Sequence, residues 1–345
     1  MKKILIIFSA LLFFISGTDA LAVKNITGTT SGGDFSKVGA AGAQFMKIGI
    51  GPRAAGMAGA FGAVADDLTS VFWNPAGLAN VRSIQASFNY TSWFAGFDHN
   101  FGAIAMPLGD NFTVALHMVS FGSDRIEITT IDNPDGIGSY YTVADVALGA
   151  TFSGYLTDQF SFGITAKYIS NTFASLGAEG IAFDFGTMYE TGIQGIKLGF
   201  SIHNLGAEQQ YEGEDLRSSK KIWEDLNAAP LDAAYITTPF SLPLIFRAGI
   251  SADVVEMDEH KLMASFDFVT LSDTPEQFAL GMEYTWNELL SLRGGYILGH
   301  DQFNLAGGVG INYFTGNFMG QLDYSISPTS DIGLVHRIGI SLGVD

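Results

Sequence analysis

The stretch Lys261-Leu-Met-Ala-Ser-Phe-Asp-Phe268 alternates between two kinds of side chain. Its even-numbered residues are all apolar, whereas the odd-numbered ones include Lys261, Ser265 and Asp267. Successive residues of an extended strand point to opposite faces, so the stretch predicts a strand with one apolar face. The same alternation recurs at residues 278–286, 303–313 and 337–344.

Fourteen such segments follow one another through the chain. They start near Ser83, His99, Asn111, Tyr140, Phe160, Ala178, Ile196, Pro243, His260, Pro275, Leu289, Phe303, Asn317 and Val335. An even number of strands allows a closed antiparallel barrel with both chain ends on one side. We therefore predict an all-β fold, a 14-stranded antiparallel transmembrane β-barrel over residues 81–345.

The lengths of the connections support this topology. Alternate links are short, at residues 107–111, 157–159, 190–195, 256–259, 287–288 and 315–316. The links between them include the long segments 122–139 and 207–242. Short turns on the periplasmic side and longer loops on the external side are typical of outer-membrane barrels.

The composition agrees with a membrane protein that has no membrane helix. Of the 345 residues, 47% are hydrophobic and only 15% are charged, with 42 glycines and a mean hydropathy of +0.25. Beyond residue 20 no apolar run is long enough for a transmembrane helix. These properties suit strands in which every second residue faces lipid.

A soluble β-sandwich is the alternative to a barrel, but its water-facing residues should be strongly polar. Here the less apolar face is rich in Gly, Ala, Ser and Thr, as in a crowded interior. Its charged members carry both signs, so we expect ion pairs across the lumen and contacts with a plug. They are Lys167, Asp184, Lys197, Arg247, Asp253, Asp267, Glu283, Arg293, Asp323 and Arg337.

The first twenty residues predict a cleaved signal peptide. Lys2 and Lys3 precede an apolar stretch at residues 4–15, and Thr18-Asp19-Ala20 offers a cleavage site. The apolar stretch is too short for the alternative, a retained membrane anchor. We expect export through this signal peptide to the cell outer membrane, with outer-membrane lipid around the barrel.

Charge and cysteine content exclude several classes of function. The formal net charge is −18, which argues against nucleic acid as a partner. The absence of cysteine excludes disulfides, thiol nucleophiles and cysteine-ligated metal centres.

Residues 21–80 differ from the barrel and predict a small helical hatch in the lumen. Residues 53–67 suggest a short helix with a glycine at every third position, and Asp66-Asp67 could cap a second helical turn that ends before Asn74-Pro75. The Asn-Pro pair either shapes a hatch that gates the lumen or only ends a helix before the first strand. The candidate gating residues are Arg53, Gly56, Gly59, Asp66, Asp67, Asn74 and Pro75.

Two motifs in this segment carry a family resemblance. Gly51-Pro-Arg-Ala-Ala-Gly-Met-Ala-Gly-Ala-Phe-Gly-Ala-Val-Ala-Asp-Asp67 and Phe72-Trp-Asn-Pro-Ala-Gly-Leu78 resemble the N-terminal signature of the PorV/PorQ family, within the broader FadL-like outer-membrane barrels. The resemblance implies a fourteen-stranded barrel with a hatch. For PorV-type members it also implies type IX secretion, with secreted cargo proteins and secretion components as partners.

The long link at residues 207–242 is a second candidate site, because loops of this length usually have a function. It is either a partner-binding loop or lid, or a solvated loop without fixed structure. Its apolar anchors for a partner are Tyr211, Trp223, Tyr235 and Phe240.

No motif predicts an enzyme, a cofactor or a metal site. Residues 132–136 lack the full ligand set of a calcium loop and predict a plain turn. The six histidines are scattered, and no nucleophile elbow is present.

Aromatic residues near the strand ends suggest anchoring at the membrane interface. They are Tyr90, Trp93, Phe94, Tyr155, Tyr168, Tyr189, Trp286 and Tyr313.

Two functions follow from these expectations. The leading one is a non-enzymatic barrel in protein secretion or surface attachment, which binds proteins at its external face. The alternative is a FadL-like transporter of a hydrophobic small molecule. A transporter needs an apolar pocket from the loops to the hatch, whereas a shuttle tolerates a filled lumen, which the small lining residues slightly favour.

Overall fold

The computed structural model describes residues 41–220, 231–330 and 332–344. The predicted signal peptide, residues 1–20, lies outside this part of the chain, as do residues 21–40 of the predicted hatch and Trp223.

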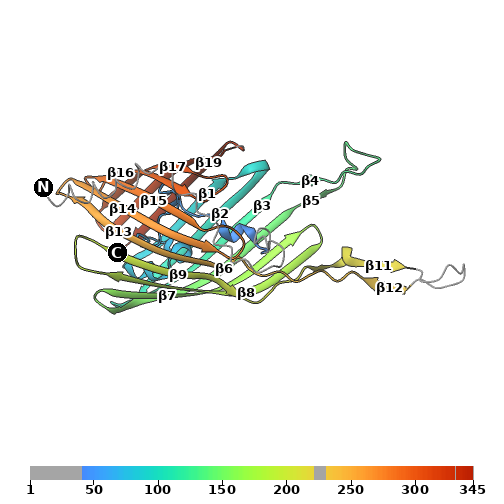
Figure 1. Ribbon diagram of the computed structural model, residues 1–345, viewed down its shortest axis with the longest axis horizontal. Helices are drawn as coiled ribbons and strands as arrows, with labels where there is room; N and C mark the ends of the chain where they lie inside the picture. Colours follow the sequence, from blue (N-terminus) through green and yellow to red (C-terminus); the bar gives the residue numbers. More distant parts are fainter. Residues whose placement is uncertain (1–40, 221–230, 331, 345) are drawn as a thin grey trace, which may run out of the picture. The chain divides into compact units, whose positions relative to one another are not determined.

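Fourteen antiparallel strands form a closed barrel, which confirms the predicted fold (Figure 1). Each strand pairs with its neighbours in sequence, and β1 pairs with β19 to close the barrel. Every predicted strand start lies close to an observed one. The strands are β1 (Ile84–Ser92), β2 (Phe97–Leu108), β3 (Phe112–Ser123), β6 (Val143–Thr157), β7 (Phe160–Phe173), β8 (Leu176–Glu190), β9 (Lys197–Gly206), β13 (Ile245–Glu256), β14 (His260–Leu271), β15 (Gln277–Trp286), β16 (Leu290–Leu298), β17 (Leu305–Thr315), β18 (Phe318–Pro328) and β19 (Leu334–Val344).

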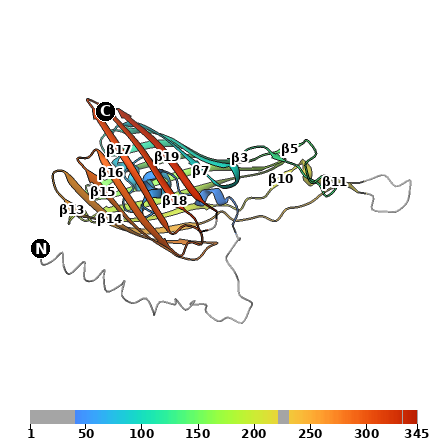
Figure 2. The same ribbon diagram turned by 90° about the horizontal axis from the view of Figure 1, so that it is seen from above.

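The two ends of the barrel differ as the link lengths predict. At one end, the turn end, short turns join β2 to β3 and β17 to β18. At the other, the loop end, the long links form small elements that project from the barrel (Figures 1 and 2). These elements are β4 (Ile126–Glu127), β5 (Tyr140–Tyr141), β10 (Glu212–Gly213), η4 (Glu214–Leu216), β11 (Arg217–Lys220) and β12 (Leu231–Ala234), with η3 (Phe94–Gly96) in the link between β1 and β2.

Alternation along the strands separates an apolar exterior from a packed interior. In β19, Ile338, Ile340 and Leu342 are exposed on the outside, whereas Val335 and Arg337 are buried. Such an exterior suits contact with lipid acyl chains. None of the helices in the described residues is long and apolar enough to cross a membrane.

Most charges of the interior pair along the wall with partners on the same side of the barrel, whereas the sequence predicted pairs across the lumen. Lys167 Nζ lies 2.8 Å from Asp184, Arg293 contacts both Glu283 and Asp323 at 2.5 Å, and Arg247 pairs with Asp267. Buried charges that are paired in this way avoid much of the cost of leaving water. Two further pairs, Lys197 with Glu190 and Lys261 with Asp253, are partly exposed to solvent.

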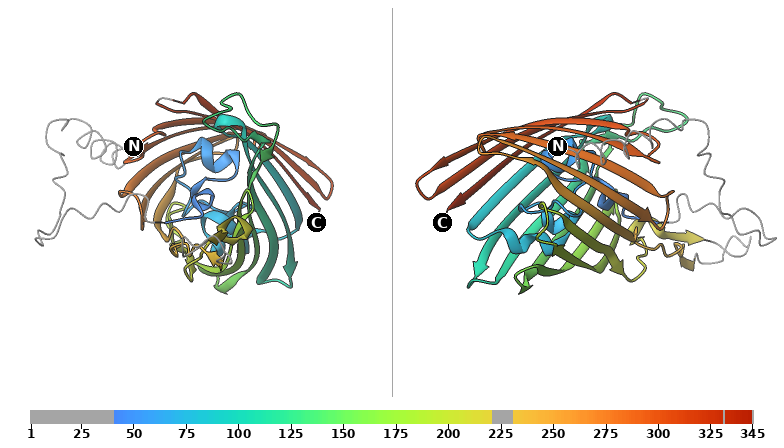
Figure 3. Two further views of the ribbon diagram at one scale, coloured as in Figure 1. Left: turned by 90° about the vertical axis from the view of Figure 1, so that its right-hand side faces the viewer. Right: turned by 60° about the vertical axis from the view of Figure 1, so that its left-hand side comes forward.

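Residues 41–80, which we call the luminal segment, lie inside the ring of strands (Figure 3). The segment contains η1 (Gln44–Lys47), α2 (Pro52–Gly56), α3 (Ser70–Trp73) and η2 (Pro75–Asn80). Met57, Phe61 and Leu68 are fully buried in its core.

The helix expected over residues 53–67 is wrong in length, because α2 ends at Gly56. Ala58 and Gly59 have φ angles of 54° and 79°, in the left-handed region that ends a helix. The segment therefore consists mostly of turns between short helical pieces.

Candidate functional site

Hydrogen bonds from many strands hold the luminal segment in place. Asp267 on β14 accepts from the backbone N–H groups of Phe61 (3.1 Å) and Gly62 (2.7 Å). Further contacts come from Ser153 on β6, Arg247 on β13 and Ser201 on β9. Because these strands lie around the barrel, the segment is fastened on several sides.

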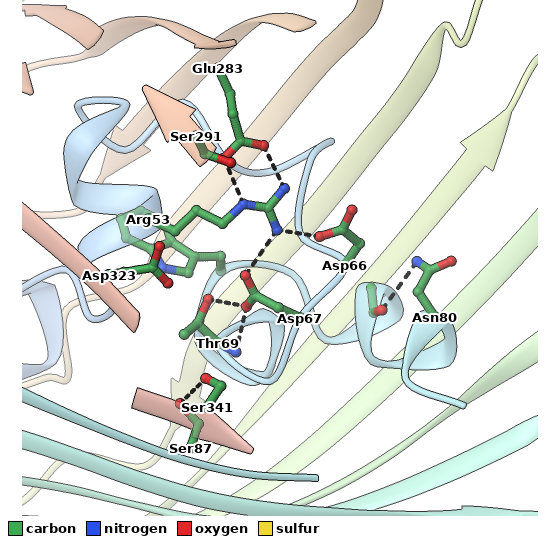
Figure 4. Close-up of polar contacts among 12 residues, drawn as sticks. Arg53, Asp66, Asp67, Thr69, Asn80, Ser87, Glu283, Ser291, Asp323 and Ser341 are labelled. Carbon is green, nitrogen blue, oxygen red and sulfur yellow. Dashed lines mark hydrogen bonds and ion pairs between the residues drawn. The ribbon is translucent and has the colours of Figure 1, made fainter. Parts of the chain in front are cut away.

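Arg53 is the centre of the largest charged cluster (Figure 4). Its guanidinium forms a two-pronged contact with Glu283, at 3.0 Å from Nε and 2.8 Å from Nη2. Nη1 contacts Asp66 at 2.5 Å and Asp67 at 3.0 Å. Burial alone would lower the pKa of Arg53, but the adjacent carboxylates outweigh it and raise the pKa well above its ordinary value. The cluster therefore joins two parts of the segment to β15.

The remaining predicted gating residues shape the luminal segment. The backbone at Gly56 lies so near β17 that a Cβ there would be 3.2 Å from Gly308 Cα. Asp67 accepts a 2.8 Å bond from the Thr69 N–H just before α3. Asn74 follows the end of α3, and Pro75 starts η2. The Asn-Pro pair thus ends one helix and begins another, while gating by these residues stays a prediction.

Replacing Asn74 by alanine is expected to loosen the luminal segment. The Asn74 amide is fully buried and donates to Gly62 O (2.8 Å) and Thr187 O (3.2 Å). Loss of these bonds leaves buried carbonyls unpaired, which costs about 1 to 3 kcal/mol. Hydrogen exchange of residues 60–78 should speed up accordingly, whereas the same change at the exposed Asn133 should have no effect. Unchanged exchange in the Asn74 variant would contradict this role.

A pocket of about 540 Å³ lies between the luminal segment and the loop end. Its floor is formed by the segment, including Phe45, Ile48 and Trp73. Its walls come from the loop-end halves of β13 to β19, including Ile297. The lining is mainly apolar, and its volume is in the range of small-molecule sites.

Three aromatic residues from two separate links meet in this lining. The Trp93 ring lies 4.9 Å from Phe94 and 5.8 Å from Phe303, and Phe94 stacks on Phe303 at 6.3 Å. Trp93 and Phe94 belong to the β1–β2 link, and Phe303 to the β16–β17 link. The prediction that Trp93 and Phe94 anchor the barrel in the membrane interface is therefore wrong, because they turn toward the pocket.

Tyr155 also departs from that prediction. Its hydroxyl donates to Asn80 Oδ1 at 2.6 Å, and the Arg82 guanidinium lies over its ring at 5.0 Å. It thus packs against the end of the luminal segment. The other predicted interface aromatics, Tyr90, Tyr168, Tyr189, Trp286 and Tyr313, are exposed.

Among the described residues, the pocket lining holds three cationic side chains and no carboxylate. Lys47 pairs with Asp273 at 2.9 Å. Arg247 pairs with Asp267 at 3.6 Å and lies over the Trp73 ring at 4.7 Å. Arg337 donates to Ser327 Oγ at 2.9 Å and has no acidic partner among the described residues. The sequence predicted Arg247 and Arg337 as charges of the inner face but did not indicate Lys47. It could not show that Arg337 differs from the others, because that depends on where their partners lie in the folded barrel.

Ser201, His203 and Asp184 form a cluster beneath Trp73. Ser201 Oγ lies 2.8 Å from His203 Nε2, and His203 Nδ1 lies 3.5 Å from Asp184. Although these residue types resemble a nucleophilic triad, Ser201 Oγ donates to Trp73 O, and His203 Nε2 lies 3.2 Å from the same oxygen. The Ser201 hydroxyl hydrogen is therefore bonded to a backbone carbonyl, so we interpret the cluster as a support that fixes the position of Trp73.

The long link between β9 and β13 contains a hairpin of β11 and β12 in its described part. Tyr211 packs against Phe240 at 5.3 Å, and both are half-buried. Tyr235 lies at the base of the hairpin, where its N–H donates to Leu216 O. None of these three residues lines the pocket described above. Their binding of a partner stays a prediction.

The described residues hold no group of three histidine or acidic side chains that could ligate a metal. In the link between β3 and β6, the Gly136 N–H donates to Asn133 O at 3.2 Å, and the chain turns there.

No protein-family model matches the chain, and no curated protein matches it by sequence. Solved structures do match by fold. The toluene transporter TbuX of Ralstonia pickettii is 13% identical with a TM-score of 0.55, covering 86% of this chain and 97% of its own. The toluene transporter TodX of Pseudomonas putida is 12% identical with a TM-score of 0.57 and the same coverage. A FadL homologue of Pseudomonas aeruginosa is 14% identical with a TM-score of 0.50, over 85% of this chain and 98% of its own. The chain therefore has the fold of FadL-like outer-membrane barrels.

Proposed function

We propose that the protein takes up a hydrophobic small molecule across the outer membrane. The observation that carries this proposal is the mainly apolar pocket between the loop end and the luminal segment. A pocket in this place is what the sequence analysis required of a transporter. The luminal segment closes the pocket toward the turn end, so uptake also requires movement of this segment.

The comparisons support the proposal at the level of the fold. TbuX and TodX are toluene transporters, and this chain shares their barrel over most of its length. The same fold is consistent with the resemblance of residues 51–78 to the PorV/PorQ family, which we retain as a proposal.

Filling the pocket should block uptake. Ile297 lines the pocket, whereas its neighbour Leu298 is half-exposed on the outside of β16. We expect Ile297→Trp to lower the uptake of radiolabelled toluene by cells about tenfold. The larger indole ring occupies the binding volume, so the ligand loses most of its apolar contact area with the pocket. Leu298→Trp is the matched control and should leave uptake unchanged.

The Ile297 variant must first be shown to reach the outer membrane as a folded barrel. Equal uptake by the folded Ile297→Trp variant and the wild type would contradict a transport route through the pocket. Mass spectrometry of the purified barrel should also detect a retained apolar molecule.

Binding of proteins at the loop end is the second candidate function, as the PorV/PorQ resemblance implies. The observation in its favour is that apolar side chains project from the loop-end links, with Ile131 fully exposed and Ile236 89% exposed. Mild crosslinking and co-purification, with and without residues 208–240, would test it. Unchanged recovery of partners after the deletion would reject this loop as the binding site.

A further inference from the structure

We propose that the pocket binds an organic anion that carries an aromatic ring, and that Arg337 holds its anionic group. This inference rests on the proposed uptake function, because it specifies the ligand of the same pocket. It differs from that function in requiring a charge, which toluene lacks.

The charge of the lining points to an anionic ligand. The protein carries a net charge of −18, yet the described part of the pocket lining has no carboxylate and contains Lys47, Arg247 and Arg337. Lys47 and Arg247 are each compensated by an aspartate next to the pocket. Within the described residues, one full positive charge therefore remains uncompensated at an apolar site.

The Arg337 side chain is buried and has few partners. Only 5% of Arg337 is exposed, and its Nε has no hydrogen-bond partner among the described residues. The hydroxyl of Ser327, 2.9 Å from Nη1, is neutral. A buried guanidinium without an anion is costly, and a ligand anion would remove that cost.

No carboxylate of the described residues forms an ion pair with Arg337. Thr91 on β1 pairs with Arg337 on one side and with His99 on the other, which places these three residues in one row across the wall. His99 is 1% exposed, and its Nε2 also lacks a partner among the described residues. Two unpartnered nitrogen atoms in one row are consistent with a site that a bound group completes.

His300 provides a further donor in the lining. Its Nδ1 accepts from the backbone N–H groups of Gln302 (3.1 Å) and Phe303 (3.2 Å), so the ring hydrogen resides on Nε2. Burial lowers the pKa of His300, which keeps the ring neutral at pH 7. A neutral imidazole N–H can donate a hydrogen bond to an anion but cannot neutralise its charge. The negative charge of the ligand would therefore be neutralised by Arg337.

The aromatic side chains of the lining suit a ligand that contains a ring. Trp93, Phe94 and Phe303 present ring faces and edges in the lining, with Trp73 in the floor. Contacts between aromatic rings contribute beyond simple apolar burial. The lining therefore favours a ring over a straight hydrocarbon chain of similar volume.

Three probes separate these features. They are 3-phenylpropanoate, which has both ring and charge; 3-phenylpropanol, which has the ring alone; and octanoate, which has the charge alone. Binding is measured by calorimetry on the full mature barrel in detergent. We expect phenylpropanoate to bind at least tenfold more tightly than either of the others, a difference of about 1.4 kcal/mol.

Arg337→Met should abolish this preference by weakening phenylpropanoate about tenfold while leaving phenylpropanol within about twofold. Arg217→Met, at an exposed arginine of the β11 strand, is the matched control and should change neither. Because no described residue is an acidic partner of Arg337, its replacement by a residue of similar length should not lower the melting temperature. Arg337→Lys, which keeps the charge, should retain part of the preference even if the methionine variant fails to fold.

The outcomes distinguish the two proposals. If phenylpropanol binds as tightly as phenylpropanoate, the anion site is rejected and uptake of a neutral molecule stands. If octanoate equals phenylpropanoate, the ring preference is rejected. If the folded Arg337→Met variant keeps the preference, the role of Arg337 is rejected. If none of the probes binds, and toluene does not bind either, both proposals fail.

Discussion

Replacing Arg53 by methionine is expected to release one side of the luminal segment and to raise the ion conductance of the barrel several-fold. Arg53 is the contact through which α2, Asp66 and Asp67 are joined to Glu283 on β15. Removing one partner of a buried ion pair costs about 3 to 5 kcal/mol, because the remaining charges stay buried without compensation. Glu283 retains Arg293 as a partner, so the loss falls mainly on the segment. The wall should therefore stay folded while the segment opens.

The measurement is single-channel conductance in a planar bilayer, together with protease cleavage of residues 53–70 in the purified barrel. Arg53→Lys keeps the charge but loses the two-pronged contact with Glu283, so it should give an intermediate conductance. Arg217→Met, on the exposed hairpin, is the control and should behave as wild type. Wild-type conductance and protection in Arg53→Met would show that the other strand contacts alone hold the segment.

The barrel itself could be predicted from the sequence because lipid imposes a simple rule on it. Every second residue of each strand must be apolar, as in Leu262, Phe266 and Ile340, whichever side chain lies beside it. This rule marks strands and their order without any knowledge of partners. The same alternation also predicted that the inner face carries small and charged side chains.

The pocket could not be predicted in this way, because it depends on where side chains from distant links meet. Trp93 and Phe94 lie at a strand end, where an aromatic residue can turn outward to the membrane interface or inward to the lumen. Only the contact with Phe303, more than 200 positions later in the chain, decides for the inward direction. Position along the strand is therefore insufficient evidence for an interface aromatic.

The charges of the interior show the same limit. Their presence on the inner face predicted that they would pair, but not which partner each would find. Arg293 has two carboxylates and Arg337 has none among the described residues, although both occupy equivalent alternating positions on their strands. The difference that marks a binding residue is thus a property of the assembled wall.

The family motif likewise has a structural reading that is separate from function. Arg53, Asp66 and Asp67 form an ion cluster, and Asn74 bonds to Gly62 O and to β8. These contacts give the residues a structural role in the luminal segment that requires no part in secretion. A resemblance that rests on them indicates the barrel and its luminal segment more strongly than it indicates the cargo.

Lys167→Met should destabilise the barrel by about 3 to 5 kcal/mol, because it leaves the Asp184 carboxylate without its cation. Lys167 Nζ lies 2.8 Å from Asp184 and 2.5 Å from Asn204 Oδ1, and both charged side chains are almost completely buried. In this variant Asp184 still accepts a hydrogen bond from the Asn204 N–H, 2.8 Å away, and still contacts His203. The expected loss of stability therefore lies near the lower end of this range. The midpoint of urea unfolding in lipid vesicles, followed by tryptophan fluorescence, should fall accordingly.

Two further variants separate the cost of an unpaired charge from that of a lost contact. Lys167→Met combined with Asp184→Asn removes both charges, so it should recover most of the lost stability. Lys197→Met breaks a comparable pair with Glu190, at 3.2 Å, but its side chain is 29% exposed and that of Glu190 is 35% exposed. Such a solvated pair contributes only about 0 to 1 kcal/mol. Equal losses of stability in Lys167→Met and Lys197→Met would mean that water reaches the inner wall around Lys167 and Asp184. Burial of Arg337 without an acidic partner among the described residues would then be no evidence for a bound anion.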